Sequence, residues 1–351
     1  MRLAVAAALC ALLTIPAAAE AAKPKPKTAK TVVVERASGN VRVKPRGKRS
    51  FSRLDKAVAV PVGSTIDATD GHVKLTSTAN RSGSKLQSAE FYDGEFSVSQ
   101  KRASRPLTDL TLTGGDFSSC VNEKRRTGVF ASRATRRRLW GKGRGRFRTR
   151  GRNGTATVRG TTWLTEDGCE ETKALARTGV VKAESKESLN YDLDEPNESV
   201  VFTCNTEGIE GISRLYCLAA LSRPANAKQP FDLVGFGIAT VLTPQDTYTV
   251  CVSGSDGSNE CGDFPFKTDT LDDGTPIKVG GIGCVPGTPG QYAVQWLIGG
   301  TALPVPLPYT STTPSAESGC VSDPPRPGID TPARLSGKQL GQARAAARVG
   351  H

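Results

Sequence analysis

Histidine is nearly absent from this sequence, which contains only His72 and His351 among its 351 residues. Catalytic nucleophiles usually need a nearby base, and histidine is both the commonest such base and the commonest metal ligand. His72 falls on an expected strand, beside the turn residues Asp70 and Gly71. We therefore predict that the protein is not an enzyme, that it has no catalytic and no metal-binding residues, and that it needs no cofactor.

The sequence also lacks any pair of cysteines at the C-x-x-C spacing that zinc sites and redox centres use. Nine cysteines are present, and one of them, Cys10, lies in the apolar N-terminal run. An even number in an exported chain indicates disulfides. The remaining eight are Cys120, Cys169, Cys204, Cys217, Cys251, Cys261, Cys284 and Cys320.

Two of these cysteines precede residue 190, so we expect Cys120 to pair with Cys169. The six that follow allow fifteen pairings. We favour neighbours in the sequence, because each such pair spans a plausible hairpin or two adjacent strands. The favoured pairs are Cys204–Cys217, Cys251–Cys261 and Cys284–Cys320.

Long apolar runs are missing after the N-terminus. Residues 3–15 form an apolar run after the positive Arg2, and Ala19 and Ala21 supply the small residues that a signal peptidase requires. This run is too short to cross a hydrocarbon core of about 30 Å. We expect a cleaved signal peptide at 1–22, no membrane span after its removal, and a secreted or cell-envelope location.

Charge is divided unevenly along the chain. Residues 31–189 carry 32 basic and 16 acidic residues (32 − 16 = +16), whereas residues 190–322 carry 5 basic and 15 acidic ones (5 − 15 = −10). The polar stretch "SLNYDLDEPNES" between them is typical of an exposed linker. The predicted division is a Lys/Pro-rich spacer at 23–35, a basic domain at 36–188, an acidic linker at 189–198, a Cys-rich domain at 199–322 and a disordered or weakly helical tail at 323–351.

Both domains show the pattern of strands. Apolar residues alternate with polar ones in "GNVRVK", "DGHVKLTS" and "TDLTLT", and no long stripe of helical period interrupts them. In "FYDGEF", Asp93 and Gly94 favour a tight hairpin turn. The apolar runs after residue 198 are separated by Gly, Pro and Asp turns, as in an antiparallel sandwich of immunoglobulin or fibronectin kind. We predict an all-β protein.

A densely basic stretch, "RRRLWGKGRGRFRTRGR" at 136–152, keeps a strict parity from Leu139 onward. Basic residues occupy even positions, while glycine, leucine, phenylalanine and threonine occupy odd ones, as expected for a strand with one basic face. Its glycines indicate close approach of another backbone. We call its even-numbered residues the basic comb: Lys142, Arg144, Arg146, Arg148, Arg150 and Arg152.

Three motifs resemble, in content and order, the extracytoplasmic domain of FecR-type proteins over residues 38–185. They are an opening Gly-x-Val-x-Val strand, a central G-x-x-I-x-T-x-x-G-x-V-x-L block and a closing Val-Arg-Gly-Thr segment followed by Gly-Val-Val. The insert "LWGKGRGRFRTRGR" resembles an actinobacterial branch of exported FecR-like proteins. The matching residues are Gly39, Val41 and Val43; Gly63, Ile66, Thr69, Gly71, Val73 and Leu75; and Val158, Arg159, Gly160, Thr161, Gly179, Val180 and Val181.

This resemblance implies an extracytoplasmic sensory or binding module. FecR-type regulators also carry a cytoplasmic anti-sigma segment and a membrane helix, neither of which is visible in this sequence. The family provides no catalytic residues to transfer. The resemblance therefore favours a binding or scaffold protein over a transmembrane signalling protein.

Three function classes follow from these observations. The first is a secreted binding module at the cell envelope, whose comb recognises a polyanion such as an acidic polysaccharide, or whose partner is an extracellular protein. The second is an exported nucleic-acid-binding protein, against which export and the scarcity of aromatics beside the comb both argue. The third is a hydrolase, disfavoured by the residue inventory. Equally open is that the comb pairs with the chain's own carboxylates.

Overall fold

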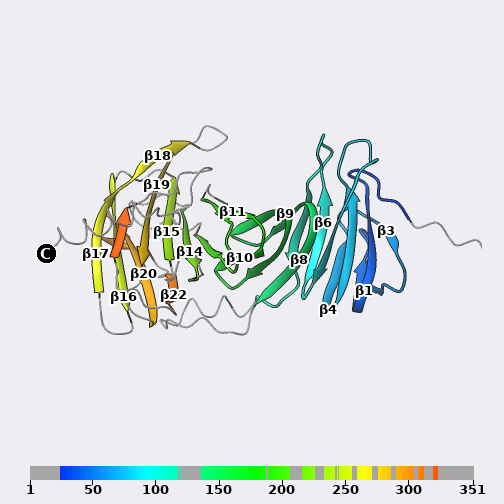
Figure 1. Cartoon of the computed structure of the whole chain (residues 1–351), viewed down its shortest axis with the longest axis horizontal. Coiled ribbons are helices and arrows are strands. Elements are labelled where there is room, and N and C mark those ends of the chain that lie inside the picture. The colour runs from blue at the N-terminus through cyan, green and yellow to red at the C-terminus, as the bar shows by residue number, and fades with distance from the viewer. Residues whose placement is uncertain are drawn as a thin grey trace, which may run out of the picture.

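The structure is a computed structural model, in which every element with defined bounds is a strand, as predicted for an all-β protein. Figure 1 shows an elongated molecule, with β1, β3 and β4 at one end and β16, β17 and β20 at the other. The structure describes residues 24–117, 120, 136–186, 189–205, 216–225, 233–241, 243, 245–254, 259–270, 276–285, 290–303, 307–311 and 319–322.

The first seven strands build a small barrel together with β8 (Arg137–Arg150). Strand β4 pairs with β5 and with β6, β6 pairs with β7, and β8 pairs with both β5 and β7, so the ring β4–β5–β8–β7–β6 closes on itself. Strand β1 pairs along β4 on the outside of this ring. The bounds are β1 (Thr31–Lys44), β2 (Ser52–Arg53), β3 (Val58–Pro61), β4 (Thr65–Thr78), β5 (Leu86–Tyr92), β6 (Glu95–Gln100) and β7 (Thr108–Thr113).

Alternation of side chains fills the barrel. In β5 and β6 every second residue is buried, which places Phe91 and Phe96 in contact inside the ring with ring centroids 5.5 Å apart. Phe91 also packs edge-on against Phe147 of β8 and Trp163 of the next strand. The apolar residues that predicted strands are therefore the core residues.

The parity predicted for residues 139–152 is present in β8. Leu139, Phe147 and Thr149 are fully buried, whereas the even positions 142, 144 and 146 are exposed. A glycine is required at 143, because a Cβ there would lie 2.5 Å from the Cα of Ala89 on β5. The glycines of this stretch thus permit the close backbone approach that the sequence indicated.

The strands after β8 continue the same sheet. β9 (Gly154–Asp167) pairs with β8, β10 (Glu171–Thr178) and β11 (Val181–Ser185), and β10 pairs with β13 (Ser199–Asn205). Hydrogen bonding is therefore continuous from the barrel into the Cys-rich half of the chain. The larger hydrophobic core is continuous too, since it includes Phe147 of β8 and Phe202 of β13.

The predicted exposed linker at 189–198 is exposed only at Asp192, Pro196 and Asn197. It forms β12 (Asn190–Leu193), paired with β11, and Leu189, Tyr191 and Leu193 are buried in the larger core. Glu198 is fully buried as well, where Arg223 binds its carboxylate. Asp192 and Asp194, which suggested a linker, alternate with these apolar residues. The segment is therefore a strand with one buried face and one face toward solvent.

Two other local predictions need correction. The spacer predicted at 23–35 overlaps β1, which begins at Thr31, and the turn before it is hydrogen-bonded to the barrel. Asp93 has the expected positive φ of 64°, but the strands on its two sides do not pair with each other. Each pairs with β4 instead, so Asp93 and Gly94 form a corner of the barrel and not a hairpin turn.

The C-terminal half is a sandwich of two sheets. One contains β14, β15 and β19; the other is built on β16 and β20, and their facing residues form a second core around Tyr248 and Trp296. Strand β14 is buried on both faces because it lies between the two cores. The bounds are β14 (Tyr216–Arg223), β15 (Leu233–Val241), β16 (Thr247–Gly254), β17 (Asn259–Pro265), β18 (Lys267–Thr270), β19 (Pro276–Val285), β20 (Gly290–Ile298), β21 (Thr301–Ala302), β22 (Leu307–Ser311) and β23 (Gly319–Ser322).

Three of the four expected disulfides are present. They link Cys120 to Cys169, Cys204 to Cys217 and Cys251 to Cys261. The last two join residues directly opposite each other on neighbouring strands. The backbone register also places Cys284 opposite Cys320, although the side chains of this fourth pair lie outside the description.

Candidate anion-binding surface

Strand β8 changes its partner in the middle of the basic comb. It pairs with β5 up to Arg144 and with β7 from Phe147 onward, and its register with β9 shifts between Gly143 and Arg146. Gly145 takes a φ of 136°, which a side chain would strain. The comb is therefore divided into two parts, before and after this point.

Two of the three arginines in the second part of the comb are bound by a carboxylate, whereas Arg152 is exposed. Arg148 donates through Nε and Nη2 to the two carboxylate oxygens of Asp109, at 2.5 and 3.1 Å, and Arg150 Nε donates to the same carboxylate at 2.9 Å. Arg152 donates to the carbonyl oxygen of Cys169 at 3.2 Å, and its guanidinium lies 5.3 Å from the ring of Phe117. Arg148 and Arg150 therefore join β8 to β7 through Asp109.

The first part of the comb is exposed. Lys142, Arg144 and Arg146 lie on the surface and form no ion pair with any residue that the structure describes. Arg146 donates through Nη1 to the carbonyl oxygen of Arg105, at 2.7 Å. A carbonyl leaves the arginine charge uncompensated.

Folding gathers more basic residues around Arg144 and Arg146. We define the basic rim as the exposed lysines and arginines of the segments 27–30, 79–85, 101–107 and 144–146, which contain no aspartate or glutamate. Within the described part of the chain, none of them forms an ion pair. The nine residues are Lys27, Lys30, Arg81, Lys85, Lys101, Arg102, Arg105, Arg144 and Arg146.

These four segments meet because they lie at the same end of the barrel. β4 ends at Thr78 and β5 begins at Leu86; β6 ends at Gln100 and β7 begins at Thr108. Both connections project together at the top of Figure 1. Thr28 donates to the carbonyl of Asn80 at 3.3 Å, which ties the segment before β1 to the first turn.

A buried network of polar side chains supports the rim from inside the barrel. The backbone N–H of Arg146 donates to Gln87 Oε1 at 2.9 Å, and Gln87 Nε2 donates to Thr108 Oγ1 at 3.1 Å. Gln100 Nε2 donates to the same hydroxyl at 3.0 Å, and its Oε1 accepts from Thr78 Oγ1 at 3.0 Å. Because these groups are buried and hydrogen-bonded, they fix the ends of β4 and β6 and the starts of β5 and β7 relative to one another.

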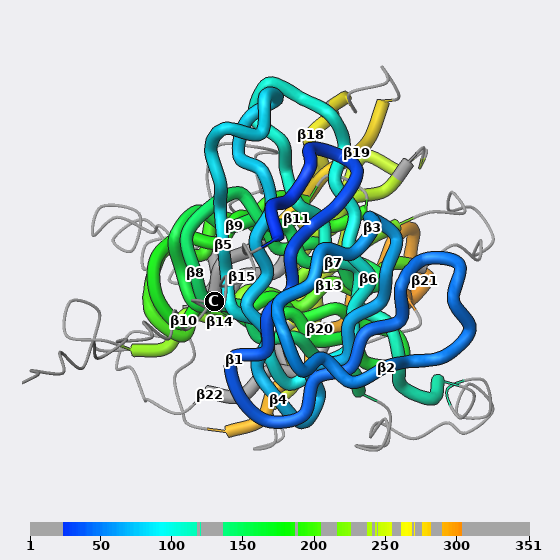
Figure 2. The backbone as a smooth tube through the Cα atoms, turned by 90° about the vertical axis from the view of Figure 1, so that its right-hand side faces the viewer, coloured from blue at the N-terminus to red at the C-terminus, as the bar shows by residue number. Residues whose placement is uncertain are grey.

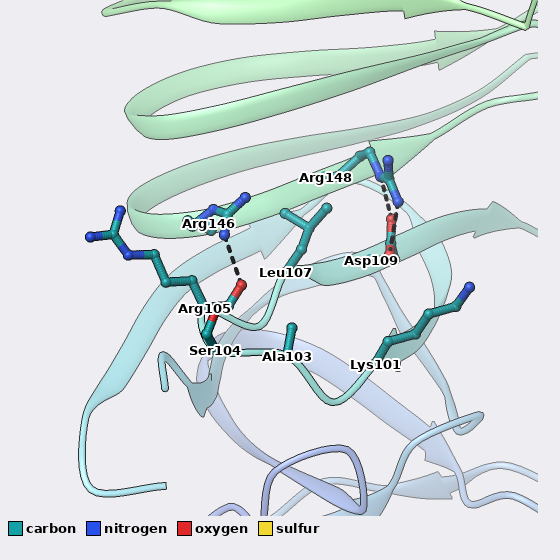
Figure 3. A pocket seen from close by; sticks show the side chains of 8 residues that line it. All are labelled: Lys101, Ala103, Ser104, Arg105, Leu107, Asp109, Arg146 and Arg148. Atoms are coloured by element: carbon teal, nitrogen blue, oxygen red, sulfur yellow. Dashed lines mark hydrogen bonds and ion pairs between the residues drawn. The ribbon is translucent and has the colours of Figure 1, made fainter. Parts of the chain in front are cut away.

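A shallow hollow of about 440 Å³ opens within the rim, between β8 and the 101–107 connection. Figure 3 shows Arg146 and Arg148 on one side of the hollow, Leu107 between them and the connection, and Lys101 on the other side. Asp109 lies at the edge of the hollow and forms an ion pair with Arg148. The hollow thus combines cationic walls with a small apolar floor.

Sequence reasoning found Arg144 and Arg146 of the rim and missed the other seven. Each of these stands in a turn or before the first strand, where a lysine or arginine is ordinarily only a solvated residue. The signal available was that two connections and the segment before the first strand are basic and contain no acidic residue. That these connections share one end of the barrel depends on the pairing of the strands.

The rim can bind anions by charge and by forked hydrogen bonds. Arginine grips carboxylate or phosphate bidentately, while lysine acts as a mobile point charge. The four rim segments contain no Phe, Tyr or Trp on which a base could stack. The surface is therefore suited to a polymer that presents regularly spaced anionic groups.

In the described part of the chain, no helix is long and apolar enough to cross a membrane, and no three His, Cys, Asp or Glu side chains are grouped to hold a metal ion. Comparisons of the chain with protein-family models, with curated proteins and with solved structures gave no match.

Proposed function

We propose that the protein is an exported, non-catalytic module that binds a linear polyanion at the cell envelope through the basic rim. One observation carries this proposal: nine exposed basic residues come together from four separate segments that contain no aspartate or glutamate, above a network of buried hydrogen bonds. Mutual repulsion of these charges costs stability. A bound anion relieves that repulsion.

Several features support an envelope location. Three disulfides are present, and such bonds persist in oxidising compartments outside the cytosol. The apolar N-terminal run followed by Ala19 and Ala21 has the pattern of a signal peptide.

The FecR-type resemblance also supports this location. Two of its motif glycines lie opposite each other on β1 and β4: a Cβ on Gly39 would be 2.6 Å from the Cα of Gly71. Such a contact gives the glycine positions of the motif a structural purpose.

Acidic polysaccharide is the polyanion that this surface fits best. A uronic acid carries one carboxylate on each sugar ring, and the hollow offers Arg146 and Lys101 for the carboxylate with Leu107 beneath the ring. Nucleic acids are less well matched, since the rim has no aromatic side chain. The FecR-like outer module, in this proposal, acts as a scaffold on an anionic wall polymer.

The proposal predicts binding of polygalacturonate and no binding of dextran, its uncharged counterpart. Equilibrium binding of the labelled protein to each polymer, at low and high NaCl, is the measurement. Binding should be saturable and should weaken steeply with salt, because exposed charges are screened over about 8–10 Å at physiological ionic strength. Equal binding to dextran, or tighter binding to single-stranded DNA than to polygalacturonate, would rule the proposal out.

A second prediction concerns Asp109, the carboxylate that occupies Arg148 and Arg150. Asp109→Asn should raise the affinity for polygalacturonate roughly fivefold, since removing one nearby negative charge is worth about 1 kcal/mol. It should also lower the melting temperature, because three charge-assisted hydrogen bonds from Arg148 and Arg150 are weakened. Both changes can be read from the same preparation, by titration and by thermal unfolding.

The matched control for this prediction is Asp93→Asn. Asp93 also binds an arginine, Arg138, but Arg138 pairs with β9 at a distance from the rim. Because each variant replaces one aspartate by asparagine, the two variants have the same net charge. If Asp93→Asn raises the affinity as much as Asp109→Asn does, the gain comes from overall charge and the rim plays no special part.

A further inference from the structure

A second group of basic residues lies in the connection from β1 to β3. We define the basic hairpin as residues 44–56, "KPRGKRSFSRLDK", which carry six basic residues and one acidic residue, Asp55. Arg53 forms an ion pair with Asp55, and the other five basic residues form none within the described part of the chain. Of these five, Lys44 is half-buried and the rest are exposed. The six basic residues are Lys44, Arg46, Lys48, Arg49, Arg53 and Lys56.

The tip of the hairpin has a defined conformation. Lys48 N donates to the carbonyl oxygen of Pro45 at 2.9 Å, and Gly47, inside this tight turn, takes a φ of 83°. Leu54, which follows the tip, is buried in the core. The basic side chains are therefore attached to an ordered backbone, so little conformational entropy is lost from the backbone when they bind a partner.

Hydrogen bonds connect the hairpin to the basic rim. Arg46 N donates to Ser64 Oγ at 3.0 Å, and Ser64 Oγ donates to the carbonyl oxygen of Pro61 at 2.7 Å. The next residue, Val62, donates its backbone N–H to the carbonyl oxygen of Lys30 at 2.9 Å. Because Lys30 belongs to the rim, the two basic surfaces share a border.

This border is formed by residues 61–64, which we call the bridge segment. A Cβ on Gly63 would lie 3.1 Å from Cδ of Arg46, so the arginine side chain extends across this glycine. Gly63 N donates to the carbonyl oxygen of Val98 at 2.7 Å, three residues before Lys101 of the rim. In Figure 2, β3, which leads into the bridge segment, lies between the dark blue segment before β1 and the blue connection that carries β2.

The segments that meet at this border carry no carboxylate. Residues 57–64 and 96–107 contain no aspartate or glutamate, and Pro61 and Gly63 are exposed. An anion held by Arg46 therefore lies next to the rim, with no acidic residue of these segments between them. Positive charges gathered in this way repel one another, and a bound anion that extends over both surfaces relieves the repulsion.

We propose that the rim, the bridge segment and the hairpin form one continuous track for a single chain of anionic polysaccharide, so that the protein selects long chains over short fragments. The inference rests on the proposed function of the rim. A short fragment occupies the rim alone, whereas a chain long enough to cross the bridge segment also reaches the hairpin. Once the rim has bound the chain, the hairpin contact forms within the same complex, at a high effective concentration.

Calorimetric titration with oligogalacturonates of increasing length, from the trimer to the long polymer, tests this track. The hairpin variant keeps the backbone hydrogen bond of Arg46 and carries Arg46→Gln, Lys48→Gln and Arg49→Gln. Its matched control removes the same number of positive charges at exposed or half-exposed positions outside the track. This control carries Arg36→Gln, Lys173→Gln and Lys186→Gln.

A carboxylate placed on the bridge segment tests whether the two surfaces act as one. Pro61→Glu adds a negative charge at an exposed position between Lys30 and Arg46. Its control, Thr268→Glu on β18, adds the same charge at an exposed position in the C-terminal half of the chain.

We expect the affinity of the wild type to rise with chain length beyond the length at which the hairpin variant levels off. The hairpin variant should bind the long polymer roughly 100-fold more weakly, at about fivefold for each basic residue removed, and the trimer equally well. Pro61→Glu should level off at the same length as the hairpin variant. Both controls should follow the wild type.

An identical length dependence in the wild type and the hairpin variant overturns the inference and leaves the rim as the binding surface. An equal loss for the trimer and the long polymer also overturns it, as does a Pro61→Glu variant that matches Thr268→Glu, because the hairpin then does not act together with the rim. Absence of binding by the wild type at every length refutes the proposed function, and the inference with it. Should the triple variant fail to fold, Lys48→Gln with Arg49→Gln replaces it, and the same comparisons apply.

Discussion

Arg223→Met is expected to lower the free energy of unfolding by about 3–5 kcal/mol, the cost of leaving a buried charge without its partner. Glu198 is fully buried, and Arg223 donates to its Oε1 through Nε at 3.0 Å and Nη2 at 2.8 Å. The other oxygen, Oε2, accepts the backbone N–H groups of Asp194 and Glu195. Chemical denaturation at pH 7 measures the loss.

The loss should depend on pH in a defined direction. Burial raises the pKa of the Glu198 carboxyl, against the opposing effect of Arg223. A carboxyl with a raised pKa binds more protons in the folded state, so its contribution to stability falls as pH rises from about 4.3 through the folded value. Without Arg223 the folded pKa rises further. The variant should therefore be closest to wild type at acid pH and furthest from it at pH 8.

Arg138→Met serves as the control, because its ion pair with Asp93 is half-exposed. Exposed pairs contribute about 1 kcal/mol or less. Equal losses in the two variants, or a loss for Arg223→Met that does not change between pH 5 and pH 8, would show that the buried pair does not hold the junction of β12 and β13.

The rim variant carries Arg81→Gln, Lys101→Gln, Arg105→Gln and Arg144→Gln. We expect it to bind long polygalacturonate roughly 100-fold to 1,000-fold more weakly than the wild type. Four basic residues are removed, and each contributes about 1 kcal/mol near an anionic surface at moderate salt. Its melting temperature should stay within a few degrees of wild type, since relief of repulsion offsets the small losses in packing. Fluorescence titration and thermal unfolding give the two quantities.

Its matched control removes four exposed or half-exposed basic residues outside the rim. The control variant carries Arg36→Gln, Lys74→Gln, Lys173→Gln and Lys186→Gln. Net charge is then the same in the two variants, and only the position of the change differs. Comparable losses of affinity would mean that polymer binding follows the total charge of the protein.

Much of the fold was predictable because β structure leaves a local signature. Side chains alternate across a strand, so the parity of residues 139–150 predicted β8 without any knowledge of its neighbours. The disulfides between Cys204 and Cys217 and between Cys251 and Cys261 were predictable for the same reason, since each joins two strands that are close in the sequence.

Features that depend on distant pairing were not predictable. Asp93 and Gly94 have the chemistry of a hairpin turn, but β4 pairs with both flanking strands and makes the turn a corner. Residues 189–198 look like a linker because the partners that bury Tyr191 and Glu198 come from elsewhere in the chain. The rim depends on distant pairing in the same way, and two residues of the comb, Arg148 and Arg150, proved to be bound by Asp109.

Salt dependence of polygalacturonate binding tests the central claim, that the rim is the anion-binding surface, most directly. The logarithm of the affinity should fall linearly with the logarithm of the NaCl concentration, with a slope set by the number of basic residues in contact. We predict that the rim variant has a slope smaller by roughly 3, at about 0.7 for each contact removed. The control variant should keep the wild-type slope. A rim variant whose slope equals that of the wild type would contradict the account.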